Sequence, residues 1–337
     1  MFIQANVQNS ETVQRPVNTR RVELLHEFVA DHADSGYRTA LETENGSVSF
    51  RDLDIRASRV ANFLISQGVQ SGNVVAIRQP WTTDLFASVL GVLKAGASYI
   101  VIDPATDEGE ALGMVIQSGA VVLFESSTLT PLPARQNSPT IVIENARETL
   151  ELFLGKVSFA GRRRPIASRT ARIVCNKGRP GVSSVKHQEA VKLTRSLIKL
   201  YGIDEGARCA HAPSVAVDVA IEEALAVLAA GATLVLGRPE AETADAWATF
   251  VAAEGITHLS TTPDQVAGFG DDVSGLQVLI VGRDQCPSDL VVKWALRLCR
   301  IVTIRRAGDR FPSYRMEQDG PAASRPNLIF ARAAEQR

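Results

Sequence analysis

Short apolar runs alternate with helical segments along most of the chain, and this alternation limits the fold more than any other feature. A strand at Val74–Ile77 is followed by a helix at Asp84–Ala95, a strand at Ser98–Ile102, a helix at Gly109–Gly119 and a strand at Ala120–Phe124. Strands that alternate with helices of about 10–15 residues form βαβ units. The pattern therefore predicts an α/β fold with mostly parallel sheets.

The second half of the chain repeats the alternation. It predicts four helices and five strands, at Gln188–Tyr201, Val219–Ala230, Ala244–Glu254 and Ser288–Leu298 and at Ile173–Cys175, Thr233–Leu236, His258–Thr261, Val278–Val281 and Arg300–Ile304. The stretch between Leu129 and Thr170 is rich in proline and less regular. A length of 337 residues is enough for about two domains or subdomains.

Composition excludes several classes of protein. Hydrophobic residues make up 45% of the chain and charged residues 22%, and the net charge of −1 gives no overall field for nucleic acid or an anionic membrane. The longest apolar stretch, residues 220–236, contains Glu222 and Glu223, which a bilayer core would disfavour. Four cysteines without a C-x-x-C pair favour a reducing, cytoplasmic setting. Residues 1–19 are interpreted as a mostly polar, flexible N-terminal tail.

Five segments, taken in order, resemble the adenylation domains of nonribosomal peptide synthetases, which belong to the adenylate-forming (ANL) superfamily. The clearest is Leu93–Asp103, which is similar to the family's LKAG-x-AYVP-(I/L)-D segment. The others are Val48–Leu53 with the helix that follows it, Val217–Ala220 with the later LAAGATLVL run, Ile256–Asp264 and Leu276–Cys286. The resemblance covers about residues 20 to 335.

The resemblance implies the fold of the large N-terminal domain of an adenylate-forming enzyme, with two layered αβα subdomains and mostly parallel sheets. We expect the first α/β subdomain at residues 20–190 and the second at 191–337. The family continues through a hinge to a small C-terminal domain that carries a lysine for the reacting carboxylate. Here Ser324–Asn327 is similar to the family's G-R-P-x-x-N segment and the chain ends at Arg337, so we expect that small domain to be absent and the second subdomain to be truncated.

The phosphate-binding loop of the family has a degenerate counterpart. Gly178 and Gly181 keep the spacing of two loop glycines, and Lys177 precedes them. Arg179 and Pro180 replace the hydroxyl residues between the glycines, and proline also removes a backbone N–H donor. Because oriented N–H groups and hydroxyls hold the phosphates in such loops, we expect phosphate binding to be lost.

The family's second catalytic segment, N-x-Y-G-P-T-E, falls on Arg305–Phe311, where only Gly308 is retained. The Glu of that segment helps to bind Mg²⁺, and Phe311 offers no oxygen ligand in its place. We therefore predict that no cofactor binds, ATP and Mg²⁺ included, and we assign no catalytic residue. Cys209 and His211 lie two residues apart, but no second pair completes a metal site, so no metal is predicted and His211 is interpreted as an ordinary histidine at a strand end.

The resemblance also identifies candidate substrate-pocket residues. In members that activate amino acids, the Asp at the position of Asp218 pairs with the substrate ammonium group. The positions that would line the pocket are Asp218, Val219, Glu222, Ser260, Ile280, Gly282 and Arg306. The family often has an aromatic residue where Glu222 stands, and we expect Glu222 to pair with Arg306 and close the cavity.

Three functional hypotheses follow. The first is a non-catalytic adenylation-like protein, or pseudoenzyme, of a secondary-metabolite pathway. It would act as a scaffold or by binding a peptide synthetase module, a carrier protein, a tailoring enzyme or a second copy of itself, and neither nucleic acid nor membrane. The second is a repurposed enzyme or binder that uses Asp218 to hold an amine-bearing pathway intermediate. The third is a half-enzyme complemented in trans by a separate C-terminal domain.

Overall fold

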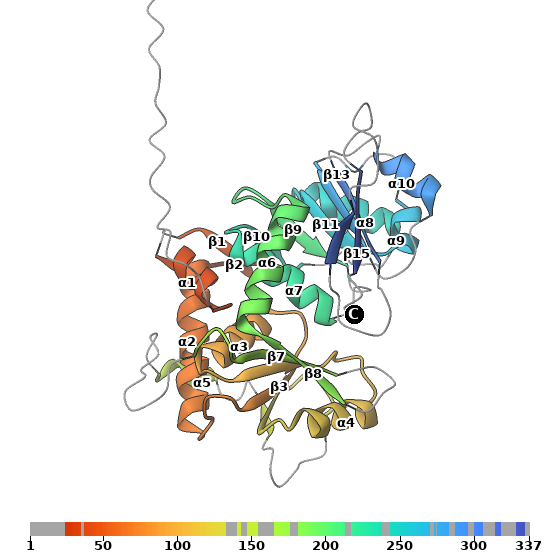
Figure 1. The fold of residues 1–337 in the computed structure, drawn as a ribbon. Helices are drawn as coiled ribbons and strands as arrows, with labels where there is room; N and C mark the ends of the chain where they lie inside the picture. Colours follow the sequence, from red (N-terminus) through yellow and green to blue (C-terminus); the bar gives the residue numbers. More distant parts are fainter. Residues whose placement is uncertain are drawn as a thin grey trace, which may run out of the picture.

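The computed structural model describes residues 24–34, 37–132, 140–142, 147–153, 165–175, 181–212, 217–237, 243–269, 273, 275–282, 287–295, 300–305, 314–317 and 328–333. Within them the strands form two sheets of six and nine strands. Figure 1 shows the two sheets in separate layers, with helices between them and on their outer faces.

The six-stranded sheet has the order β6-β5-β3-β4-β7-β8 and is parallel except for the β7–β8 hairpin. Its strands are β3 (Val74–Arg78), β4 (Ser98–Val101), β5 (Val122–Glu125), β6 (Thr140–Val142), β7 (Thr170–Cys175) and β8 (Val182–Lys186). In β3, β4 and β5 nearly every side chain is buried, as expected for parallel strands that are covered on both faces.

The nine-stranded sheet has the order β14-β15-β13-β12-β11-β9-β10-β1-β2 and is antiparallel only at its two ends. Its strands are β1 (Thr39–Thr43), β2 (Gly46–Ser49), β9 (Arg208–His211), β10 (Thr233–Val235), β11 (His258–Thr261), β12 (Val278–Val281), β13 (Arg300–Arg305), β14 (Tyr314–Glu317) and β15 (Leu328–Ala333).

Helices fill three layers around the sheets (Figure 1). They are α1 (Glu27–Ala33), α2 (Phe50–Ser66), α3 (Thr83–Lys94), α4 (Glu108–Ser118), α5 (Arg147–Glu151), α6 (His187–Tyr201), α7 (Val217–Ala229), α8 (Ala244–Ala253), α9 (Pro263–Ala267) and α10 (Ser288–Ala295). The layer between the sheets contains α3 and α7, whereas α4 lies beyond the six-stranded sheet and α8, α9 and α10 beyond the nine-stranded one.

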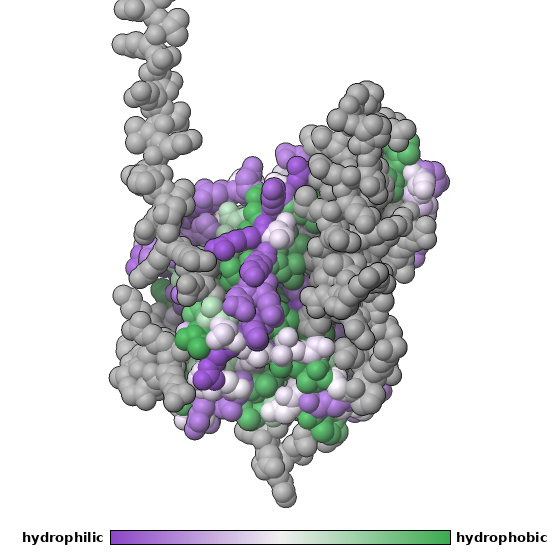
Figure 2. Space-filling view, viewed as in Figure 1, coloured by the Kyte–Doolittle hydropathy of each residue, from purple (hydrophilic) through white to green (hydrophobic). Residues whose placement is uncertain are grey.

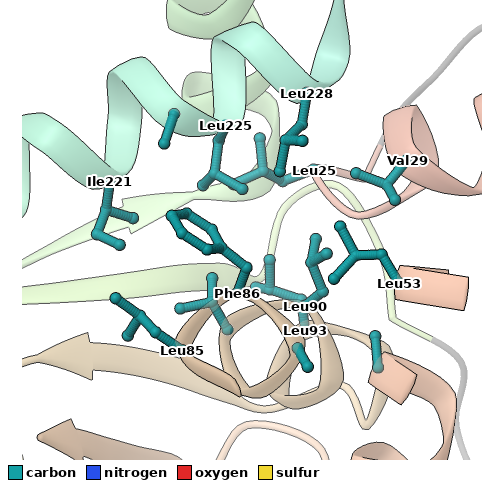
Figure 3. Packing of buried hydrophobic residues seen from close by; sticks show 14 of the residues in the cluster. Leu25, Val29, Leu53, Leu85, Phe86, Leu90, Leu93, Ile221, Leu225 and Leu228 are labelled. Carbon is teal, nitrogen blue, oxygen red and sulfur yellow. The ribbon is translucent and has the colours of Figure 1, made fainter. Parts of the chain in front are cut away.

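The largest core cluster joins the two sheets through α3 and α7. Figure 3 shows Leu85, Phe86, Leu90 and Leu93 of α3 facing one side of α7. That side consists of Ile221, Leu225 and Leu228, whose spacing of four and three residues places them on one helical stripe. Because the same cluster includes strand residues of both sheets, the two sheets share one core.

Helix α6 lies at the front in Figure 1 and is amphipathic. Its inner side buries Ala190, Val191, Leu197 and Leu200, whereas Lys192 and Lys199 are exposed. Figure 2 shows the exposed side as a hydrophilic band that crosses the front of the molecule. The αL conformation of Gly202, with a φ of 68°, ends this helix.

Most of the long predicted elements are present with ends that shift by a few residues, although residues 296–299 of the helix predicted at Ser288–Leu298 lie outside the described residues. One finding differs from the expected division at residue 190. Strands β1 and β2, which fall within 20–190, belong to the nine-stranded sheet because Leu41 of β1 pairs in parallel with Leu234 of β10. The expected tail at residues 1–19 lies outside the described residues.

Candidate functional site between the two sheets

Helix α7 carries two adjacent buried carboxylates, one directed toward each sheet. Glu222 and Glu223 are 6% and 1% exposed. Successive residues of an α-helix point about 100° apart, so the two side chains reach different partners. Glu222 forms an ion pair with Arg172 of the six-stranded sheet, and Glu223 contacts His211 of the nine-stranded sheet.

The Glu223 carboxylate is held from two elements. The Tyr201 hydroxyl at the end of α6 donates to Glu223 Oε1 over 2.7 Å, and His211 Nε2 lies 3.2 Å from Glu223 Oε2. The Trp81 ring packs edge-on against His211, with 5.6 Å between the ring centroids. His211 is the last residue of β9 and Trp81 follows β3, so this contact joins the carboxyl ends of parallel strands from both sheets. Ligands of open α/β sheets bind at that end of the strands.

His211 belongs to a row of residues that crosses neighbouring strands. Ser260 of β11 is its Cα partner, and Ile280 of β12 is the partner of Ser260. Adjacent strands in register turn paired residues to the same face, and Ile280 packs in the cluster that contains Ile221 of α7. Thus the row faces the layer that contains the two glutamates.

The Arg172–Glu222 pair lies on the other side of α7. Tyr99 of β4 is the Cα partner of Arg172 in β7, so both face α7. The β7–β8 pairing shifts register between Thr170 and Arg172, and such a bulge changes the direction of the bulged strand's side chains. Burial raises the pKa of the Tyr99 phenol, with the Glu222 charge acting in the same direction and the Arg172 charge opposing it.

The structure brings several predicted pocket residues together. Val219 and Glu222 both lie on α7, three residues apart, and Ser260 pairs with Ile280 in the adjacent sheet. Gly282 directly follows β12, and its N–H donates to the Thr261 carbonyl over 3.1 Å. Ser260, Ile280 and Gly282 therefore lie at or beside the carboxyl ends of β11 and β12, whereas Val219 and Glu222 lie on α7.

Other predicted residues cannot be placed in the same way. Asp218 is in the first turn of α7, but its side chain lies outside the described part of the structure, as do Arg306, Lys177 and Gly178. The predicted Glu222–Arg306 pair therefore stays a prediction, although Glu222 already has Arg172 as a partner.

Gly181 is the one residue of the degenerate phosphate loop that is described. Its φ is +116°, a conformation that favours glycine, and its N–H donates to Gln117 Oε1 of α4 over 3.2 Å. This hydrogen bond connects the residue before β8 to α4.

Sequence reasoning missed Arg172, Tyr201, Glu223 and Trp81, and it interpreted His211 as ordinary. One signal was present: two consecutive glutamates inside an otherwise apolar helix require buried partners. The identity of those partners depends on strand pairings that join distant parts of the chain.

The described ranges contain no group of three or more His, Cys, Asp or Glu side chains suited to a metal ion. Within the same ranges no helix has both the length and the apolar character needed to cross a membrane. Burial raises the pKa of the Cys209 thiol, so this cysteine beside His211 stays protonated.

Sequence comparisons connect the chain with peptide synthetases. Residues 28–167 match the family model for "AMP-binding enzyme". A linear gramicidin synthase polypeptide of Brevibacillus parabrevis is 28% identical over 317 residues, which are 91% of this chain and 6% of that protein. Novobiocin biosynthesis protein H of Streptomyces niveus is 26% identical over 266 residues, 76% of this chain and 44% of that protein. The chain therefore spans less than half the length of these relatives.

Solved structures show the same fold. The nonribosomal peptide synthetase FmoA3 in its AMPPNP-bound form superposes with a TM-score of 0.73 at 22% identity, over 86% of this chain and 32% of that one. VinN gives a TM-score of 0.71 at 15% identity, over 83% of this chain and 73% of that one. The expected fold class, layered α/β subdomains with mostly parallel sheets, is confirmed by these superpositions and by the sheet topology.

Proposed function

Because the chain is an adenylation-like domain of the adenylate-forming superfamily, we propose that it is a non-catalytic member that works by binding another protein. Its sequence relatives are peptide synthetases and proteins of similar pathways, which supports a role in secondary metabolism. The proposed partner is a peptide synthetase module, a carrier protein or a tailoring enzyme of the same pathway, with the cytoplasm as the setting.

One observation carries the proposal: a candidate pocket residue already binds a side chain of the protein itself. Glu222 and Arg172 are 6% and 4% exposed and form an ion pair in the layer between the sheets. Because Glu222 is a predicted pocket residue, this ion pair uses its carboxylate within the protein. Removing Arg172 from Glu222 to admit a substrate would leave a buried charge without its partner, which costs about 3–5 kcal/mol.

The sequence supports the same proposal at two other places. Arg179 and Pro180 stand where the family has hydroxyl residues for phosphate, and Phe311 stands where it has the glutamate for Mg²⁺. Phosphoryl chemistry depends on positioning and on neutralising charge, so the loss of these groups favours a role without ATP or Mg²⁺.

An exchange assay tests the non-catalytic part. Purified protein is incubated with Mg-ATP, labelled pyrophosphate and each of the proteinogenic amino acids, and label in ATP is measured. An active adenylation domain of known specificity is the positive control. We expect no exchange above the level seen without amino acid, and exchange that depends on one amino acid would contradict the proposal.

A binding assay tests the partner part. Each synthetase module, carrier protein and tailoring enzyme encoded near the chain is purified and titrated against it by biolayer interferometry. We expect saturable binding to one of them, which an excess of unlabelled chain abolishes. A protein that binds none of these candidates would contradict a role in protein–protein interaction.

A second candidate function rests on Asp218. This residue lies in the first turn of α7, four residues before Glu222, and corresponds to the family's aspartate that pairs with a substrate ammonium group. An amine-bearing pathway intermediate would then be the ligand or substrate. This alternative predicts that Asp218→Ala abolishes binding of the intermediate, whereas Asp245→Ala, on the outer helix α8, leaves it unchanged.

The third hypothesis, a half-enzyme complemented in trans, is distinguished by the same exchange assay. Adding a separately expressed C-terminal domain of a synthetase would supply the lysine that the family carries on that domain. It would supply neither the hydroxyls of the phosphate loop nor the glutamate at Phe311. We therefore expect no exchange after the addition.

A further inference from the structure

The guanidinium group of Arg172 is in the interior, between the six-stranded sheet and the start of α7. Its side chain is 5% exposed and that of Glu222 is 7% exposed. Arginine and glutamate are almost never fully buried unless they are paired. The ion pair joins β7 to α7, and its two residues are 50 positions apart in the sequence.

Stability alone does not account for this pair. Moving two charges out of water costs several kcal/mol per ion, and a buried pair can often be replaced by apolar residues of similar volume without loss of stability. The layer around it is apolar and would accommodate such a replacement, since Tyr99, Ile221 and Leu225 pack in the same cluster. We therefore look for a role of the Arg172–Glu222 pair in ligand binding.

The carboxylate of Glu222 makes this position suited to a cation. Glu222 is on α7 one turn after Asp218 and three residues after Val219, at the place where the family resemblance puts the lining of an amino-acid pocket. A carboxylate at this place would bind an ammonium or guanidinium group of a ligand through charge-assisted hydrogen bonds. In this chain the guanidinium of Arg172 makes that contact from within the protein.

We propose that Arg172 is a built-in ligand that determines specificity at this site: its guanidinium fills a cation-binding position at Glu222 and thereby excludes small amines and guanidines. The inference rests on the proposed function, because it explains how the old pocket is closed. The chemical class that the position takes is an alkylguanidinium or alkylammonium ion. Shortening Arg172 should open the position to such a ligand from solution.

The test uses Arg172→Ala in the full chain and N-ethylguanidinium as the probe. Thermal unfolding is followed with millimolar N-ethylguanidinium, with ethylammonium, and with ethylurea as a neutral molecule of the same shape. We expect the variant to melt below the wild type. We expect N-ethylguanidinium to raise its melting temperature by several degrees, as binding to the folded state requires, while ethylurea gives no rise.

Matched variants show whether the rise belongs to this site. The wild type should not respond, because Arg172 fills the position. The double variant Arg172→Ala with Glu222→Gln should lose the response, because the carboxylate is gone. Arg208→Ala removes a half-exposed arginine that pairs with Glu42 and should show no response to the cation. If Arg172→Ala does not fold, Arg172→Ser is used with the same three probes.

The proposal is overturned if the variant gains no stability from either cation, if ethylurea stabilises it equally, or if the response persists without the Glu222 carboxylate. These outcomes are independent of the exchange assay. Absence of cation rescue would leave the non-catalytic role standing, whereas ATP-dependent exchange by the wild type would contradict that role whatever the cation does.

Discussion

At the scale of single residues, the Arg172–Glu222 ion pair is distinguished by its location in the layer between the two sheets. Both side chains are nearly inaccessible, so each neutralises a charge that water cannot reach. By contrast, the pair of Arg38 and Glu205 has side chains 31% and 68% exposed. The two pairs therefore provide a comparison of one interaction type at two depths.

We predict a large coupling energy for the buried pair and a small one for the exposed pair. Arg172→Ala and Glu222→Ala should each lower the free energy of unfolding by about 3–5 kcal/mol, because each leaves a buried charge without its partner. The double variant should lose much less than the sum. The matched cycle at Arg38 and Glu205 should give a coupling of at most about 1 kcal/mol. Urea denaturation gives the free energy of unfolding of the wild type and of the single and double variants at both pairs. If the losses from Arg172→Ala and Glu222→Ala simply add in the double variant, the two residues do not interact.

His187 makes stability depend on pH. The side chain is 1% exposed, and its Nδ1 accepts a hydrogen bond from the Leu25 N–H over 3.1 Å. Burial lowers the pKa of His187 from 6.5 to about 4. Between those values the unfolded chain takes up a proton that the folded chain excludes, so this contribution is complete above pH 6.5 and declines as the pH falls toward 4.

We predict that the loss between pH 7 and pH 4 amounts to about 3 kcal/mol for this one group, at about 1.4 kcal/mol per pKa unit. The variant His187→Asn keeps an acceptor for Leu25 and removes the titration. Its unfolding free energy, measured by urea at both pH values, should therefore fall less steeply than that of the wild type. Equal slopes would show that His187 is not the group responsible.

At the scale of helices, α2 and α3 pack so closely that one position admits only glycine. A Cβ atom on Gly91 of α3 would lie 2.6 Å from Val60 Cγ1 and 2.8 Å from the Ala57 carbonyl oxygen of α2. On Gly113 of α4 the nearest atom would be Gln117 Nε2 at 4.0 Å. The same substitution should therefore have opposite signs at the two positions.

We predict that Gly91→Ala destabilises the protein by about 1–3 kcal/mol, because overpacking forces the two helices apart. Gly113→Ala should stabilise it by about 0.5–1 kcal/mol, because alanine is the better helix former and nothing obstructs it. Thermal unfolding of the two variants measures the change in stability, which should be a lower melting temperature for Gly91→Ala and a higher one for Gly113→Ala. A stabilising Gly91→Ala would show that α2 and α3 are further apart than described.

The elements that could be predicted from the sequence are those with long local periodicity. The local sequence pattern is sufficient to assign helices α3, α6, α7 and α8 and the apolar strands β3, β11 and β12. The short helices α1, α5 and α9, of seven, five and five residues, offer too few turns for a period. Strands β1 and β2 could not be assigned to their sheet, because the β1–β10 pairing joins residues that are far apart in the chain.

The candidate site was predictable only in part, for the same reason. The family resemblance identified Glu222, Ser260 and Ile280, and two of these are strand partners. It did not identify Arg172, which lies on β7 beside Tyr99 of β4 and reaches Glu222 from that strand. Partners of buried charges depend on tertiary pairing, which local sequence does not encode.

At the scale of the whole molecule, one core couples the two sheets. Residues of α3, α7 and strands of both sheets pack in a single cluster, as Figure 3 shows for the contact between the two helices. The Glu222 and Glu223 contacts join α7 to each sheet within that layer.

Calorimetric titration of the purified protein with Mg-ATP, alone and with each amino acid, measures whether the chain binds the nucleotide at all. We expect no binding heat beyond dilution, because residues 176–180 and 305–311, by their resemblance to the family's segments, have lost the hydroxyls for phosphate and the glutamate for Mg²⁺. Saturable binding of Mg-ATP would contradict the proposed non-catalytic role. It would favour an adenylation half-enzyme that needs a second domain to complete it.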